Sequence, residues 1–239
     1  VAVCWWMAGN DPGLKILRSG LDPYISMAAS NTGRPYQSFT KESPERDYAK
    51  AQLLGCQFGV GWEKFKITSG LRLNLTDKQS QAAVQTYRTT FPAVPALWKA
   101  YEKAAVLAVE NRGQVFRAGK CSFKFFNGFL WVKLPSGRKL AYSEPQLAWR
   151  ETDYGPRKTL EFWGVNPKTK KWALERTWGG TLTENLVQAT ARDLMMPAML
   201  RLERKGYRAL LMVHDEGICE KRIGEGDLKE FVSILCEIP

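Results

Sequence analysis

Histidine and cysteine are too scarce in this 239-residue chain to build a conventional zinc site. The chain contains one His and five Cys, and no two cysteines form a C-x-x-C pair. Structural zinc sites need four such ligands at short spacings, so we expect none here. The odd number of unpaired cysteines indicates reduced thiols, and we expect a cytoplasmic protein.

Long apolar runs are missing as well. No apolar segment approaches the roughly 20 residues that a helix needs to span a bilayer, so we expect no membrane partner. The N-terminal V-A-V-C-W-W-M-A-G-N is apolar but has no basic segment, and we do not expect it to act as a signal peptide.

Acidic residues are fewer than basic residues. The chain has 24 Asp and Glu against 35 Lys and Arg, which gives a net charge of +11 and a pI near 9.5. This imbalance favours a polyanionic partner, nucleic acid before an anionic membrane. The charge is spread along the chain, which suits a broad groove better than a basic arm. Hydrophobic residues make up 44%, enough for the core of one large domain or two small ones.

The most informative stretch is R-D-Y-A-K-A-Q-L-L-G-C-Q-F-G-V-G, residues 46–61. Written as a helix, it places Arg46, Lys50, Leu54 and Phe58 on one stripe, about 6 Å apart along the axis. The order of two cations, an aliphatic group and an aromatic ring matches the phosphates, sugar and base of a nucleoside triphosphate.

An alternative remains open for these residues. Arg and Lys four residues apart also occur on solvated helix faces, and Leu with Phe also occurs in cores. Gly59 and Gly61 are expected to end the helix or to let it bend.

The remaining pattern predicts a mixture of helices and short strands. Ser43 is expected to cap the helix that follows it, and Thr76 is expected to open another with a capping box, after a loop over residues 67–74. Further helices are expected over residues 14–17, 24–31, 97–111 and 181–205, the last with a kink at Pro197, and over 227–238. Alternating, aromatic-rich runs predict short strands over residues 115–117, 121–126 and 129–134, and further strands of antiparallel hairpins over 138–142, 160–165 and 171–178. Their Trp and Lys residues either stack on unpaired bases or stiffen small sheets.

A second motif lies near the C-terminus. Residues 207–213 predict a strand, and His214, Asp215, Glu216 and Gly217 predict a polar turn before the next strand. Carboxylates crowded at such a turn favour a bound cation, and hard oxygen ligands suit magnesium or manganese. An ordinary polar turn is the alternative.

Together these motifs resemble the family A DNA polymerases. R-D-Y-A-K-A-Q-L-L-G-C-Q-F-G resembles the nucleotide-binding helix of their fingers, with the pattern R-x3-K-x7-[YF]-G. V-H-D-E resembles their palm hairpin, and T-E-N-L-V-Q-A-T-A-R-D-L resembles the helix before it. A-G-N-D-P and L-P-S-G-R-K-L-A-Y are most similar to the phage branch, and the resemblance covers essentially the whole chain.

The resemblance implies an α+β fold of the right-hand polymerase type. Residues 1–35 would begin the palm-to-fingers segment, residues 36–180 would form mostly helical fingers with inserted β-hairpins, and residues 181–239 would hold a helix and the catalytic hairpin of a partial antiparallel-sheet palm. The family has a further metal-binding Asp, in a strand reading roughly D-x-S-x-x-E, upstream of the segment that matches this chain. We therefore expect a polymerase fragment that is inactive alone.

The resemblance also implies a role for each nucleotide-binding residue. Arg46 and Lys50 would bind the incoming triphosphate, and Lys50 would also supply a proton to the pyrophosphate. Phe58 would pack near the nascent base pair, and Gly59 would let the helix move. Tyr24 would approach the phosphates, while Leu54 occupies a position tied to sugar discrimination, where many relatives have Phe or Tyr.

The remaining roles concern the metals and DNA. Asp215 would ligate the catalytic Mg²⁺ or Mn²⁺ with support from Glu216, and His214 would contact the primer end. Gln188 and Asn185 would touch the minor groove of the primer-template, and Arg138 would contact the DNA backbone. The implied partners are primer-template DNA, deoxynucleoside triphosphates and the rest of the polymerase chain, in the cytoplasm of a phage-infected host.

Three other functions remain open. A single-subunit RNA polymerase shares both motifs, although Glu216 and Phe58 favour DNA synthesis. A non-catalytic nucleic-acid-binding module would account for the charge and the tryptophans. A metal-dependent hydrolase built on the His-Asp-Glu turn lacks another His to complete its ligand set.

Overall fold

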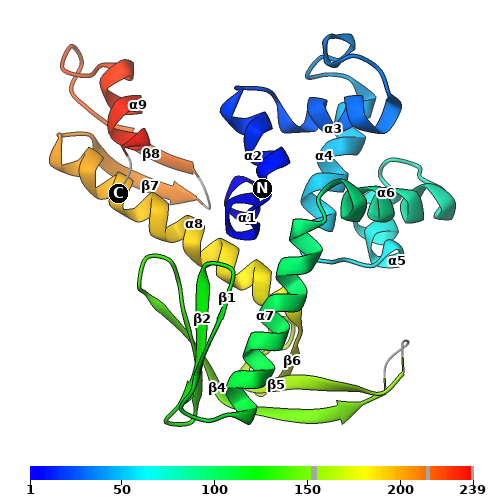
Figure 1. The fold of residues 1–239 in the computed structure, drawn as a ribbon. Coiled ribbons are helices and arrows are strands. Elements are labelled where there is room, and N and C mark those ends of the chain that lie inside the picture. Colours follow the sequence, from blue (N-terminus) through cyan, green and yellow to red (C-terminus); the bar gives the residue numbers. More distant parts are fainter. Residues whose placement is uncertain (152–154, 214–215, 238–239) are drawn as a thin grey trace. The chain divides into compact units, whose positions relative to one another are not determined.

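The computed structural model describes residues 1–151, 155–213 and 216–237, and the chain divides into two compact units, Val1–Val187 and Gln188–Pro239. The first unit combines helices with a six-stranded antiparallel sheet (Figure 1). The second contains the end of a long helix, a two-stranded sheet and a terminal helix. The expected mixture of helices and antiparallel sheets is therefore confirmed.

The helices of the first unit follow most of the predicted segments, although several begin earlier. They are α1 (Ala2–Ala8), α2 (Asp11–Arg18), α3 (Pro23–Thr32), α4 (Pro44–Cys56), α5 (Trp62–Phe65), α6 (Asp77–Thr90) and α7 (Ala93–Glu110), with a 3₁₀ turn at Tyr36–Ser38 and a π-helical turn at Lys66–Gly70. The π-helical turn lies where the sequence predicted a loop. Helix α2 includes Pro12, because proline fits the first turn of a helix, where its missing N–H is not needed.

The predicted helix caps are only partly confirmed. Thr76 and Gln79 form the expected capping box at the start of α6. Ser43 does stand at the start of α4, but its side chain makes no bond to that helix. Its Oγ instead accepts a hydrogen bond from the backbone N–H of Thr40, at 2.8 Å. The serine therefore stabilises the preceding turn.

The sheet is a simple meander in which each strand pairs with the next along the chain. Its strands are β1 (Val115–Ala118), β2 (Cys121–Phe126), β3 (Phe129–Lys133), β4 (Lys139–Arg150), β5 (Arg157–Val165) and β6 (Trp172–Thr177). Strand β4 extends well beyond its predicted end, with a bulge between Ser143 and Gln146. The bulge accommodates Pro145, which could not donate a regular ladder bond.

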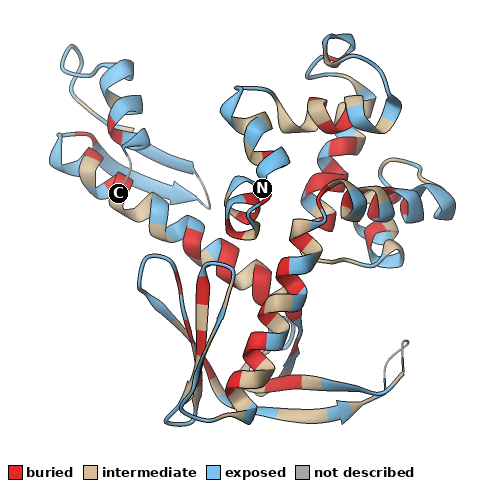
Figure 2. Ribbon diagram, viewed as in Figure 1, coloured by how far each residue is buried: buried red, intermediate tan, exposed pale blue. Residues whose placement is uncertain are grey.

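Helix α7 covers one face of this sheet (Figure 1). The ring of Tyr101 on α7 lies 5.6 Å from that of Phe123, and its hydroxyl contacts the Cys121 sulfur at 3.6 Å. Leu130 and Val132 on β3 are fully buried on the same side. Figure 2 shows these buried residues as bands on α7 and the strands, so the core of this region lies between them.

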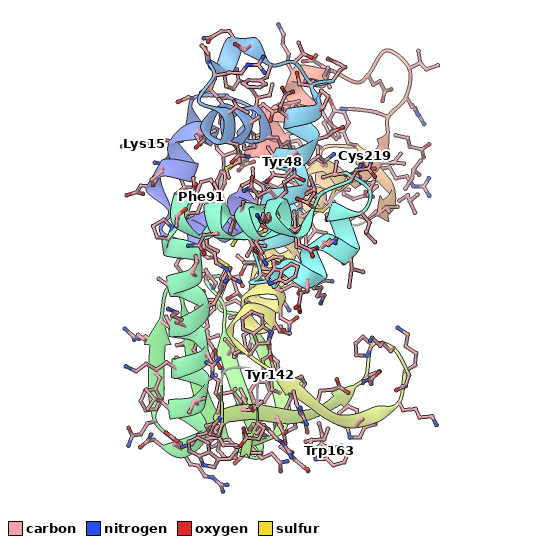
Figure 3. All side chains as sticks on the ribbon, turned by 90° about the vertical axis from the view of Figure 1, so that its right-hand side faces the viewer. Lys15, Tyr48, Phe91, Tyr142, Trp163 and Cys219 are labelled. Atoms are coloured by element: carbon pink, nitrogen blue, oxygen red, sulfur yellow. The ribbon has the colours of Figure 1, made fainter. Side chains whose placement is uncertain are left out.

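Four tryptophans in or next to the sheet are not part of that core. Trp163, labelled in Figure 3, is 38% exposed. Three others are more exposed still, at 69%, 62% and 42% for Trp149, Trp172 and Trp178. Their exposure is compatible with both expectations, stacking on unpaired bases and stiffening of the sheet at its surface.

The second unit has a small core of its own. Helix α8 (Gly179–Arg204) begins in the first unit and is continuous through Pro197. It is followed by β7 (Arg208–Val213), β8 (Glu216–Glu220) and α9 (Leu228–Cys236). Its core cluster of buried residues consists of Met199, Leu202, Tyr207 and Ile234.

The start of α8 packs unusually closely on the segment that follows α4. A Cβ atom at Gly180 would lie 2.2 Å from the carbonyl oxygen of Phe58. The indole N–H of Trp98 on α7 donates to the carbonyl of Gln57 at 3.0 Å. The end of α4 is thus fixed against two other helices, and only glycine leaves room for this contact.

We predict that Gly180→Ala destabilises the protein. Alanine is favoured over glycine inside a helix by about 1 kcal/mol, but a clash with backbone costs about 1–3 kcal/mol or more, so the clash should dominate. Gly61→Ala is the matched control, because a Cβ there meets no atom within 4 Å and φ is −74°. Thermal unfolding should show a lower Tm for the first variant alone. An unchanged or higher Tm for Gly180→Ala would contradict the contact.

Candidate functional site

Helix α4 carries the first three residues of the predicted stripe on an accessible surface. Arg46 is half-buried and Lys50 is exposed. Leu54 is 43% exposed, so it is not a core residue as the alternative required. Two cations and an aliphatic side chain therefore follow one another along a helix face that a ligand can reach.

Phe58 does not continue this stripe as a helical residue. Helix α4 ends at Cys56, and Gly59 follows in a left-handed conformation with φ of +80°. The N–H of Gly59 donates to the carbonyl of Cys56 at 3.1 Å, which closes a turn. The expected helix over residues 46–61 is therefore too long, because this turn ends it before Phe58.

Tyr24 lies beside the two cations, as the resemblance implied. The guanidinium carbon of Arg46 is 5.2 Å from the centre of the Tyr24 ring, and the Lys50 ammonium is 6.0 Å from it. Both distances allow cation–π attraction. Three expected nucleotide-binding residues, from two helices, are thus brought together in the structure.

Asp22 is a member of this group that the sequence analysis missed. Its Oδ2 accepts from Arg46 Nη2 at 2.8 Å and from Nε at 3.0 Å. Its Oδ1 accepts from the backbone N–H groups of Tyr24 and Ile25, which caps α3. The signal was present in the sequence, because Asp followed by Pro is a helix start as well as a helix break.

The charge of Asp22 is stabilised by its neighbours. Burial favours the neutral acid, but the hydrogen bonds from Arg46 and from the α3 backbone outweigh it and hold the pKa of Asp22 below its usual value. Two N–H groups of the Arg46 guanidinium, its fork, therefore already bind an anionic oxygen. An arginine fork that binds one carboxylate oxygen in this way has the geometry to bind a phosphate.

Asn185 and Gln188 lie on α8 but have different surroundings. Asn185 is half-buried and donates from Nδ2 to the hydroxyl of Tyr142 at 3.2 Å. Burial raises the pKa of Tyr142, so this phenol stays protonated. Gln188 is exposed and falls in the second unit.

Arg138 lies on a separate element, in the turn between β3 and β4. Its carbonyl accepts from the N–H of Leu134 at 2.8 Å, and its side chain is exposed. The structure therefore brings Arg46, Lys50 and Tyr24 together, whereas Arg138 presents its charge from the sheet.

The predicted metal site falls largely outside the described residues, which include neither His214 nor Asp215. Glu216 pairs with Val213 at the start of β8 and is exposed. The expected turn is wrong for Glu216 and Gly217, which belong to a strand. Among the described residues no three His, Cys, Asp or Glu side chains group to hold a metal ion. In the same part of the chain no helix has the length and apolar character to cross a membrane.

Comparison with known proteins confirms the resemblance. No protein-family model matches the chain. The chain is 32% identical over 232 residues, 97% of its length, to the DNA polymerase of Bacillus phage SP02, and it spans 35% of that protein. The POL domain of Pol1 from M. smegmatis, solved in complex with DNA primer-template and dNTP, matches 98% of the chain with a TM-score of 0.60 at 16% identity. This chain corresponds to 33% of that one.

These matches confirm the similarity to part of a phage-type family A DNA polymerase, and they confirm the polymerase-domain fold. The chain spans about a third of the length of each of these two proteins.

We predict that Asp22→Asn lowers stability by about 1.5–3 kcal/mol at neutral pH, because hydrogen bonds to charged groups contribute about that much. Asparagine keeps the cap on α3 but loses the ion pair with Arg46. Since the folded-state pKa of Asp22 is lowered, its contribution is complete above the unfolded pKa of about 3.9 and is lost as the pH falls through the folded value.

Chemical denaturation at a series of pH values measures this difference. The gap between the wild-type protein and Asp22→Asn should close toward low pH. Asp47→Asn, an exposed acid in the first turn of α4, is the control and should show a smaller gap at neutral pH. A gap that persists unchanged below pH ~2 would contradict the assigned role.

Proposed function

We propose that this chain is the nucleotide-binding part of a DNA polymerase that adds deoxynucleotides to a primer 3′-hydroxyl. The observation that carries the proposal is the similarity over 97% of the chain to a phage DNA polymerase. The grouping of Arg46, Lys50 and Tyr24 supports it, because a triphosphate needs this arrangement of cations on one surface.

We assign residues 36–180 to the fingers with their β-rich insertion and residues 1–35 to the segment that leads into them. Residues 181–239 would contribute the palm helix and hairpin. The two-stranded sheet of β7 and β8 favours the packing of further polypeptide beside it, since an isolated hairpin is marginally stable in water. Its apolar residues are about half exposed, including Leu210, Leu211 and Ile218. We propose that the rest of the polymerase chain covers them.

In this proposal Arg46 and Lys50 bind the triphosphate of the incoming nucleotide. Arg46 would exchange Asp22 for a phosphate oxygen, or hold both with different N–H groups of its fork. Leu54 would pack on the sugar, as its exposure allows. Phe58 would reach the base from the turn beyond the helix, where Gly59 lets the backbone reverse.

The chemical step is an in-line displacement. The primer 3′-hydroxyl releases its proton to water and attacks the α-phosphorus, a new P–O bond forms, and the bond to pyrophosphate breaks. Lys50 would donate a proton to the departing pyrophosphate. Asp215 and Glu216 offer the hard carboxylate oxygens that Mg²⁺ or Mn²⁺ prefers. The bound metal supplies charge stabilisation for the attacking and leaving oxygens.

The DNA contacts complete the proposal. His214 would contact the primer end, and Gln188 and Asn185 would contact the minor groove of the primer-template. For Asn185 this contact requires that its side-chain amide break or share its hydrogen bond to the Tyr142 hydroxyl. Arg138 would contact the DNA backbone from its exposed turn.

Primer extension tests the assignment of Asp215. We predict that this chain, joined to the flanking sequence of its full-length polymerase, extends a primed DNA template with magnesium and deoxynucleotides. Asp215→Asn should reduce extension at least about 100-fold while DNA binding is retained, because only the chemical step loses a charge-stabilising ligand. Asp77→Asn, an exposed acid on α6, is the control and should extend normally. Loss of extension in both proteins, or in neither, would contradict the assignment.

Single-nucleotide incorporation tests the role of Lys50. We predict that Lys50→Gln raises KM for the deoxynucleotide and lowers kcat, since the residue would bind the triphosphate and also protonate the leaving group. Lys78→Gln, which removes an exposed charge on α6, should leave both values near wild type. Equal effects of the two changes would contradict a specific site. Faster incorporation of ribonucleotides than deoxynucleotides would favour the RNA polymerase alternative.

A further inference from the structure

The face of the six-stranded sheet opposite α7 forms a concavity. All residues that line it belong to strands β1 to β4 or to the turn between β2 and β3. Strand residues alternate between the two faces of a sheet. Those of β2 and β3 that point toward α7 are apolar and buried, such as Phe123 and Leu130. The opposite side encloses a concavity of about 710 Å³, lined by Val115, Ser122, Lys124, Phe126, Asn127, Phe129, Trp131, Lys133 and Lys139.

Every ionisable group that lines this concavity is a lysine. Lys133 on β3 stands directly opposite Lys139 on β4 in the strand pairing. Like charges at directly opposed positions destabilise a sheet. In the described part of the chain, Lys124, Lys133 and Lys139 form no ion pair with a carboxylate. The folded protein therefore bears a repulsion that a bound anion would relieve.

Aromatic rings lie between these lysines. Phe126 is 53% exposed, and Lys124 holds its ammonium 5.3 Å from the Phe126 ring. The rings of Phe129 and Trp131 pack in a tilted arrangement, with their centres 5.5 Å apart. The indole N–H of Trp131 donates to the carbonyl of Phe126 at 3.2 Å, which fixes the orientation of that ring. Fixed, accessible rings can receive a stacked base with little loss of side-chain entropy.

We propose that this lysine-aromatic face, formed by β1 to β4, binds single-stranded DNA, such as the unpaired template. The three lysines would contact phosphates, and Phe126 and Phe129 would stack on bases. Cations that track a backbone and rings that accept successive bases are the two requirements of such binding. Duplex DNA fits less well, because its bases are already stacked on each other. The proposal goes beyond the proposed function, since it requires neither a nucleotide nor a metal.

Fluorescence anisotropy with a labelled oligothymidylate and the 239-residue chain tests the lysines. Each phosphate contact contributes about 0.7 to the slope of log K against log salt for single strands. Lys124→Gln with Lys133→Gln should therefore lower that slope by about 1.4 and weaken binding by about 25-fold at 0.1 M salt. Lys168→Gln with Lys171→Gln, which removes two exposed charges from the β5–β6 hairpin, should lower the salt slope and the affinity by much less.

Phe126→Ala tests the stacking separately from the charge. We expect binding to weaken at least about fivefold with no change in the salt slope, because a lost stack is not electrostatic. The side chain is half exposed, so the variant should fold, and its thermal unfolding confirms this. Ultraviolet cross-linking of the bound strand should map to β2 and β3.

Three outcomes would overturn the proposal. They are no single-strand binding by the wild-type chain, equal weakening in the two double-lysine variants, and an unchanged affinity for both Lys124→Gln/Lys133→Gln and Phe126→Ala. Competition by an acidic peptide that cross-links to the face more efficiently than DNA would assign it to a protein partner instead. Oligothymidylate binding needs no primer, nucleotide or metal, so its failure is distinguishable from a failure of primer extension.

Discussion

The close contact between the start of α8 and the turn after α4 constrains the candidate site. At one end of α4, the Gln57 carbonyl accepts from Trp98, and Gly180 leaves room for the carbonyl of Phe58. At the other end, Arg46 is held by Asp22. Because α4 is fixed at both ends, the direction of its cationic stripe is set by the fold before any ligand arrives. Such preorganisation reduces the entropy that a ligand must lose on binding.

The pair of Arg46 and Asp22 explains how a cationic site remains stable without a ligand. The side chains are 15% and 20% exposed, and partly buried cations without partners would be costly. A carboxylate that already receives two backbone N–H bonds can hold the guanidinium at modest cost. A triphosphate carries more charge than one carboxylate, so it can compete for the same fork. The site is therefore stable without a ligand, and Arg46 can still exchange its carboxylate partner for a phosphate.

Much of this arrangement could be predicted from sequence, for local reasons. The capping box at Thr76 and strand β2 were predicted at their observed positions, because they depend on neighbours in the chain. The end of α4 was not predicted at its observed position, since it depends on packing against Trp98 and Gly180, which are distant in sequence. The cap that Asp22 forms on α3 had a local signal, but its bond to Arg46, 24 residues away, had none. Local pattern selected the candidate residues, and long-range packing decides their geometry.

The two faces of the six-stranded sheet show a similar division. Alternation in the sequence distinguishes the apolar side, which α7 covers, from the polar side. It does not reveal register, so the opposition of Lys133 and Lys139 became visible only in the structure. A sheet stabilised by α7 on one side can tolerate such repulsion on the other, because burial of residues such as Phe123 and Leu130 contributes about 1.5–3 kcal/mol each. The covered face thus supplies the stability that allows the open face to keep charges suited to binding.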